Sequence, residues 1–177
     1  MYTTYLDSPL GILQLVCQDD AVTELNFLDE NCPADLQPTP SGQTPAEPAS
    51  SPSAQERAIA AEASRQLAEY FAGQRTQFTV KCRPAGTPFQ QKVWQALQDI
   101  PYGTTCAYSD IAAKIGSPNA CRAVGGANRI NPIPIIIPCH RVIGKNGNLV
   151  GFSAGIDKKI LLLELEGALL STHLPRR

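Results

Sequence analysis

The sequence predicts an α+β protein in two parts, and three observations support that fold class. Two short apolar runs in 11–28 are separated by the polar letters QDDA, which is typical of a β-hairpin. In 57–73 the apolar residues have the spacing of a helix. After Gly86 the helical patterns are short and numerous. We therefore expect a small N-terminal α+β domain with a short antiparallel sheet over 1–83, a mostly helical C-terminal domain over 86–170, and a flexible tail over 171–177.

Three more segments complete the first part. The stretch 33–56 holds six prolines and four serines with a single large apolar residue, Leu36, so we expect a mobile loop without a core of its own. In 57–73 the apolar residues recur at helical spacing and the pattern ends at Gly73. The letters TQFTVKCR, 76–83, indicate one more strand.

The second part opens with a well-marked helix. Thr87 can cap it and Pro88 suits its first position. The side chains expected on its inner face are all large and apolar, and they are Phe89, Val93, Trp94 and Leu97. Pro101 ends the helical pattern.

A pair of short helices is expected next. Ser109 would cap a helix over 110–115, Gly116 to Asn119 would form a tight turn, and a second helix would run from about 119 to 129. The pattern suits a helix-turn-helix and equally an αα-hairpin that serves only packing. The second helix is rich in small residues, which are Ala120, Ala123, Gly125, Gly126 and Ala127. Because glycine weakens a helix, something should approach that surface closely.

Composition limits the class of protein. Residues 1–70 hold two Lys/Arg against eleven Asp/Glu, whereas 71–177 hold thirteen against five, so the second part could meet a polyanion. No apolar stretch reaches the roughly 18 residues of a membrane span, and no signal peptide is evident, so we expect no membrane partner, a cytoplasmic location and reduced thiols. The six cysteines and two histidines lack zinc-like spacing, so no metal is expected.

The run IPIIIPCHRVIG places a cysteine, Cys139, directly before His140 and Arg141. An apolar run favours a buried and inert cysteine, whereas neighbouring basic groups favour a reactive thiolate. Adjacent side chains diverge, so a direct dyad is awkward, and a relay through water to His140 is easier. A buried carboxylate would orient the histidine. The stretch GIDKKILLLELEG, 155–167, has apolar residues on every side, so we expect a largely buried helix there. It offers two carboxylates, Glu164 and Glu166, and periodicity does not choose between them.

The letters PCHRV, preceded by NPIPIII, resemble the active-site signature of the O6-alkylguanine-DNA alkyltransferases. The resemblance extends from GTPFQQKVW through to LLLELEG, about half of the chain, whereas 1–83 resembles the family only in plan. It implies an RNase H-like plan for the N-terminal domain and a helix-turn-helix in the C-terminal domain. It also implies repair of duplex DNA by direct reversal. An alkyl group would pass once and irreversibly from O6-alkylguanine, with O4-alkylthymine as a second candidate, to a cysteine of the protein, with no cofactor.

The resemblance assigns roles to residues of this chain. Cys139 is implied as the alkyl acceptor, His140 as its base and Glu166 as the carboxylate that orients the base. Asn131 is implied to tie the DNA-binding helices to the active-site turn, and Tyr108 to help rotate the nucleotide and serve the leaving guanine. Arg122 would enter the duplex in place of the flipped base. Other residues implied to lie against DNA or the flipped base are Ser109, Ala120, Ala123, Gly126, Val142, Phe152, Ser153 and Ala154.

The sequence departs from the family pattern at the pocket, where Tyr-x-Gly-Gly is replaced by FSAG. Phe152 lacks a hydroxyl and Ala154 adds a methyl, which bears on how large an adduct fits. The partner implied is double-stranded DNA, approached from the minor groove by a monomer. The alternative is a protein that binds alkylated DNA without reacting, and Cys139 argues against it. A helix-turn-helix transcription factor and a cysteine hydrolase are further alternatives. A transcription factor would read bases with side chains that the second helix of the pair largely lacks. A hydrolase would catalyse many turnovers per molecule.

Overall fold

The computed structural model describes residues 1–28 and 52–169, and it divides into two compact units, Met1–Ala85 and Gly86–Arg177. The first unit contains a three-stranded antiparallel sheet in the order β1 (Tyr2–Ser8), β2 (Gly11–Gln18), β3 (Ala21–Phe27). The hairpin expected in 11–28 is therefore confirmed as β2 and β3. Cys17 pairs with Val22 across it, next to an irregularity in the register at Val16.

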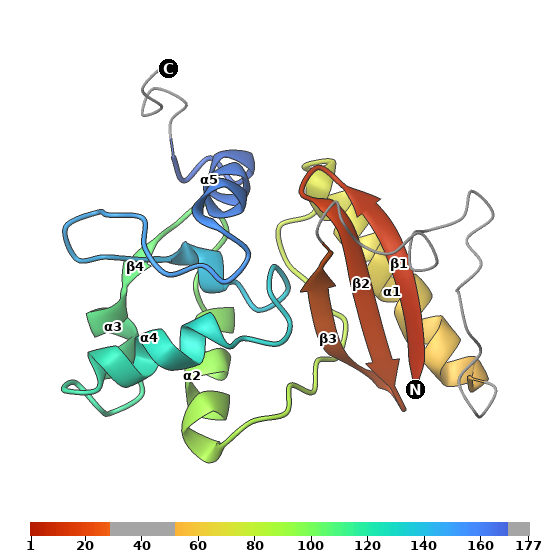
Figure 1. Cartoon of the computed structure of the whole chain (residues 1–177), viewed down its shortest axis with the longest axis horizontal. Helices are drawn as coiled ribbons and strands as arrows, with labels where there is room; N and C mark the ends of the chain where they lie inside the picture. The colour runs from red at the N-terminus through yellow and green to blue at the C-terminus, as the bar shows by residue number, and fades with distance from the viewer. Residues whose placement is uncertain (29–51, 170–177) are drawn as a thin grey trace. The chain divides into compact units, whose positions relative to one another are not determined.

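The helix α1 (Ala54–Phe71) packs against all three strands and lies along one face of the sheet (Figure 1). The side chains that it buries there include Ala60, Ala63, Leu67 and Tyr70. Together with the apolar residues of β2 and β3 they form the core of this unit. The fold of the first unit is thus α+β, as the sequence predicts.

Two boundaries in this unit differ from the prediction. The helix begins at Ala54, so the end of the expected 33–56 loop is helical, while 33–51 lies outside the described residues. Ser53 caps the helix in a reciprocal box with Glu56, whose carboxylate also pairs with the Met1 ammonium group. Polar residues are typical caps at the start of a helix, and the same polar composition is also typical of a loop, so composition alone did not predict the start of α1.

The prediction of a strand at 76–83 is wrong. Only one bridge forms there, between Val22 and Cys82, flanked by hydrogen bonds from Val22 N to Lys81 O and from Arg83 N to Val22 O. Pro84 follows directly and has no N–H to continue a ladder. Lys81 and Arg83 of this segment also form ion pairs with the acidic hairpin turn.

The second unit begins with α2 (Pro88–Gln98), which starts as predicted. Thr87 caps it by accepting from Gln90 N, with Pro88 in the first turn. Val93, Trp94 and Leu97 are buried as expected, whereas Phe89 is only half-buried. The Trp94 indole donates to the carbonyl of Ala127, 2.9 Å away, which ties α2 to the second helix of the pair described next.

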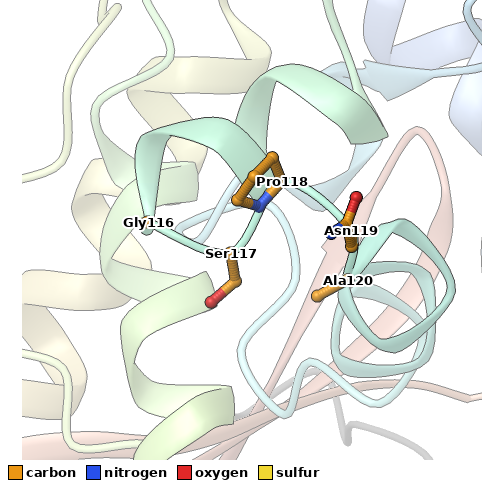
Figure 2. A pocket seen from close by; sticks show the side chains of 5 residues that line it. All are labelled: Gly116, Ser117, Pro118, Asn119 and Ala120. Carbon is orange, nitrogen blue, oxygen red and sulfur yellow. The ribbon is translucent and has the colours of Figure 1, made fainter.

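That pair is α3 (Tyr108–Lys114) and α4 (Cys121–Arg129), which pack on each other and on α2. Ser109 is not the cap: Ala107 is, and its N–H donates to the Asp110 carboxylate. Gly116, with a φ of +73°, ends α3, and Ser117 N bonds to Ala112 O in the pattern of a Schellman turn. Figure 2 shows this turn, Gly116–Ala120, bordering an open surface hollow.

The remaining elements of the second unit are short. A parallel two-stranded pair joins β4 (Cys106–Ala107) to β5 (Val142–Ile143), and α5 (Ile156–Leu165) follows. The expectation that this helix is largely buried is only partly right. Lys159, Leu162 and Leu163 are buried, whereas Leu161 and Leu165 are exposed. Among the described residues, no helix combines the length and apolar character needed to cross a membrane.

Candidate active site

The backbone before Cys139 follows a series of tight turns. Ile136 N bonds to Pro134 O around Ile135, whose φ of +72° is rare and strained for a β-branched residue. Pro138 has a φ of −80° and a ψ of 63°, and Cys139 N bonds to Ile137 O across it, which is an inverse γ-turn. The isoleucines on either side are buried, so packing holds this unusual path in place.

The Asn131 side chain bonds to the backbone of the segment that precedes Cys139. Its amide donates to Ile137 O at 2.8 Å, and its carbonyl accepts from Ile133 N at 3.1 Å. Both contacts are buried. A second asparagine, Asn128 on α4, donates to the carbonyl of Cys139 at 3.3 Å. Side chains at the end of α4 therefore fix the turn that carries the cysteine.

Cys139 begins a single 3-10 turn, Cys139–Arg141, and is 2% exposed. Burial raises the pKa of its thiol to about 11, although the Asn131 amide and the charge of Lys159 oppose that shift. At neutral pH the group is therefore a thiol and not a thiolate. Any nucleophilic role requires a base that removes the proton as the reaction proceeds.

His140 is fully buried, and its Nε2 lies 2.8 Å from Glu166 Oε1. Burial lowers the pKa of the imidazole, and Glu166 partly offsets that effect. His140 is therefore neutral at neutral pH, with a proton on Nε2 facing the carboxylate. The opposite ring nitrogen, Nδ1, is buried without a hydrogen-bond partner within the described structure, so it is available to accept a proton.

Glu166 is bound from several sides. Arg141 donates to both carboxylate oxygens, at 2.8 and 2.9 Å, and also to the carbonyl of Ile100 at 2.6 Å. Gly103 N approaches Glu166 Oε2 at 3.4 Å. The structure thus brings Glu166, and not Glu164, to the histidine. The role of Arg141 was not predicted from the sequence. Its position directly after His140 was the available signal, because two neighbouring basic side chains can share one carboxylate.

Lys159 was also missed by the sequence analysis. It is fully buried, and its Nζ donates to Val142 O at 2.6 Å and to Val150 O at 2.8 Å. Burial lowers its pKa to about 8, while the nearby Cys139 acts in the opposite direction. The lysine in the apolar stretch KKILLLEL was the available signal, because a buried ammonium requires partners.

Tyr108 shares the Val150 carbonyl with Lys159. The Tyr108 hydroxyl donates to Val150 O at 3.2 Å, so Val150 O accepts from both Tyr108 and Lys159. Burial, and then the neighbouring Cys139, raise the pKa of Tyr108. Beyond Val150 the chain runs through buried Phe152, exposed Ser153 and half-buried Ala154. Val142 is buried and follows the cysteine turn directly.

The residues expected to meet DNA lie on α4 and its N-cap, except Ser109, which lies on α3. Arg122, Ala123 and Gly126 are exposed, whereas Ala120 and Ser109 are half-buried. The buried face of the helix carries Val124, Ala127 and Asn128 instead. A Cβ at Gly126 would meet open space and one at Gly125 would make ordinary contact with the Tyr108 ring, so packing within the chain does not require glycine at either position.

Comparison with known proteins identifies the family of this chain. The family model described as "6-O-methylguanine DNA methyltransferase, DNA binding domain" matches residues 88–168, and the model for the ribonuclease-like domain of the same protein matches 1–84. The chain belongs to the 6-O-methylguanine DNA methyltransferase family. The two matches together span nearly the whole described chain.

Individual members of the family are close to this chain in sequence and structure. A Mycobacterium leprae protein named methylated-DNA--protein-cysteine methyltransferase is 45% identical over 161 residues, which is 91% of this chain and 89% of that protein. A Methanosarcina acetivorans protein of the same name is 45% identical over 95% of this chain and 99% of its own length. The crystal structure of Mycobacterium tuberculosis OGT in complex with DNA matches with a TM-score of 0.77 and 43% identity, covering 95% of this chain and 94% of that one.

Proposed function

We propose that this chain repairs DNA by direct reversal, as a methylated-DNA--protein-cysteine methyltransferase that moves an alkyl group from guanine O6 to Sγ of Cys139. The observation that carries the proposal is the buried thiol beside a neutral imidazole that Glu166 holds at 2.8 Å. The relatives with that name support the same reaction, since they are 45% identical over most of the chain.

In the proposed mechanism the thiol proton passes through a water molecule to Nδ1 of His140. The imidazolium that forms is stabilised by Glu166, with Arg141 holding that carboxylate in place. The Sγ–C bond forms while the C–O6 bond breaks, and guanine O6 takes the electron pair. The Tyr108 hydroxyl is the proposed proton donor to the departing base.

The alkylated base must leave the stack to reach a cysteine that is 2% exposed. Flipping a nucleotide costs a few kcal/mol, which contacts to the opened duplex have to offset. We propose that the small exposed face of α4 enters the minor groove and that Arg122 fills the vacated stack. A large positive net charge of the whole chain is not required for DNA binding, because the second unit alone is basic, with ten Lys/Arg against five Asp/Glu from Gly86 onward.

The product is a thioether, and none of the groups around Cys139 is suited to cleave it. Each molecule is therefore expected to react once. One copy of the chain carries the cysteine, the base and the proposed DNA-binding helix, so we propose that it acts as a monomer. O4-alkylthymine is a second candidate substrate, because its alkyl carbon is bonded to oxygen in the same way.

The test is mass spectrometry after incubation with a duplex that contains one O6-methylguanine. We expect a gain of one methylene on the peptide that holds Cys139, with one lesion repaired per protein molecule. Cys139→Ser should bind the same duplex and gain no mass. Binding of the damaged duplex by the unaltered protein without any mass gain would instead identify a non-reacting binder of alkylated DNA. Repair of many lesions per molecule would exclude the single-use mechanism.

A further inference from the structure

Among the described residues, two buried polar atoms have no hydrogen-bond partner, and each belongs to a residue next to Cys139: one residue bonds to the Cys139 carbonyl and the other follows Cys139 in the chain. They are Nδ1 of His140 and Oδ1 of Asn128. The Asn128 amide donates from its nitrogen to the carbonyl of Cys139, and His140 is the residue that follows that carbonyl in the chain. The carbonyl accepts, so the amide nitrogen faces it and the orientation of the Asn128 oxygen is fixed.

Buried polar atoms normally have partners, and a lone acceptor in a protein interior costs about 1–3 kcal/mol. Asn128 is 2% exposed and His140 is 0% exposed, so bulk solvent does not satisfy either atom. Both atoms are acceptors, because the Nε2 proton of the neutral His140 faces Glu166. One water molecule has two hydrogens to donate and would satisfy both acceptors at once.

We propose that Asn128 is a positioning residue for the alkyl transfer, whose Oδ1 fixes the orientation of the water that carries the proton from Cys139 to His140. This proposal rests on the proposed function. Before transfer, the water donates one hydrogen to Nδ1 and the other to Oδ1, so its lone pair is left to accept the thiol proton. No pattern in the sequence marks Asn128 for this role.

The same contact is retained after the proton has moved. The thiol proton becomes a water hydrogen and faces the thiolate, the former water hydrogen now lies on Nδ1, and the imidazolium donates it back to the water oxygen. The hydrogen on Oδ1 does not change partner. Asn128 therefore holds the water still while two protons shift, which reduces the reorganisation that the relay requires.

The position of Asn128 gives this contact a further consequence. It lies on the buried face of α4, opposite the exposed residues that are proposed to meet DNA. Through one amide, the helix thus holds the backbone of Cys139 and the proposed water together. A substitution at Asn128 can therefore alter the reaction without changing the surface that binds DNA.

The experiment compares wild type with Asn128→Leu, which is similar in size and lacks both polar atoms. Single-turnover repair of an O6-methylguanine duplex gives the limiting rate at saturating DNA and the apparent dissociation constant. We expect the limiting rate to fall roughly tenfold, a part of the 10²–10⁴ that general-base catalysis contributes, with the dissociation constant unchanged. Val124→Ala, a packing change on the same buried face, is the control and should leave the limiting rate of the folded protein near that of wild type.

A spectroscopic readout separates the water from a general structural effect. The chain has two histidines, His140 and His173, so ¹⁵N-histidine labelling yields few signals. In Asn128→Leu we expect the His140 Nδ1 resonance to move while Nε2, which faces Glu166, stays. In Val124→Ala both should stay. If Asn128→Leu does not fold, Asn128→Ala replaces it, with the same two expectations.

The outcomes distinguish the two proposals. A wild-type protein that gains no alkyl group would overturn the proposed function itself. An active wild type together with an unchanged rate in Asn128→Leu would overturn only the role of Asn128. A slower variant whose Nδ1 resonance has not moved would show that the amide acts only through the Cys139 carbonyl, which also overturns the water role.

Discussion

Among single residues, Glu166 holds both the base and a buried cation, and a substitution there affects both. Its oxygens contact His140 and Arg141, and Arg141 is only 5% exposed. Glu166→Gln keeps the shape but leaves the guanidinium without its counter-charge. Breaking a buried pair in this way costs roughly 3–5 kcal/mol. We therefore expect this variant to be less stable as well as slower.

The expected slowing of alkyl transfer in Glu166→Gln is roughly a hundredfold, because the amide no longer stabilises the imidazolium. The measurement is the single-turnover rate at a temperature where circular dichroism shows the variant folded. Glu164→Gln is the matched control two residues earlier in the sequence: Glu164 is half-buried, and the substitution should change neither the rate nor, beyond about 0.5 kcal/mol, the stability. A larger effect from Glu164 than from Glu166 would contradict the assignment.

Single residues also show where sequence reasoning stops. Cys139 and His140 are visible as an unusual pair, but helical periodicity left Glu164 and Glu166 as equal candidates. Glu166 is the C-cap of α5 and still has helical backbone angles, so what separates it from Glu164 is the packing of this helix end against Arg141 and His140, which helical spacing does not record. Asn128 and Lys159 went unnoticed because their importance lies in contacts to backbone carbonyls, which no pattern of side chains records.

At the scale of elements, short-range signals succeeded where the backbone itself carries the information. The Thr87 cap and the Gly116 turn both depend on residues within five positions of each other, and both are where the sequence placed them. The strand at 76–83 failed because a strand exists only through its partner. There the sheet edge offers a single bridge at Cys82.

The start of α1 allows a test of the 33–56 segment. Replacing 33–51 by a short Gly/Ser linker should change the free energy of unfolding by less than about 0.6 kcal/mol, because loop-closure entropy varies slowly with length. Ser53→Ala removes the cap of α1 and should cost about 1 kcal/mol. Thermal unfolding of both variants and single-turnover repair check this. A large loss of stability or rate with the linker would show that 33–51 packs or contacts DNA.

At the scale of the whole molecule, the reaction needs a buried cysteine and a base that normally lies inside a duplex. The structure meets the first requirement, because Cys139 is buried and therefore inaccessible to a base that remains stacked. The second depends on what α4 does to DNA. Arg122 is a long side chain on an exposed face whose neighbours Ala123 and Gly126 are small, and we therefore propose that it enters the stack.

A phosphate contact is the commonest role of an arginine in a DNA-binding helix, and it predicts a different result from stack filling. Losing a phosphate contact weakens binding to all DNA and reduces the salt slope by about one. Losing a stack-filling side chain destabilises only the flipped state, by up to a few kcal/mol. Arg129, exposed at the other end of α4, is the matched control for charge alone.

We expect Arg122→Ala to slow repair of an O6-methylguanine duplex at least tenfold more than it weakens binding to undamaged duplex. It should hardly change the reaction with free O6-benzylguanine, which needs no flipping, provided that the pocket beside Ala154 admits the benzyl group. Arg129→Ala should weaken duplex binding and leave the limiting rate unchanged. The measurements are second-order rate constants for duplex and free base, with duplex affinities, in all three proteins. Equal losses by Arg122→Ala on both substrates would point to a folding defect, and equal behaviour of the two arginine variants would reduce Arg122 to a phosphate contact.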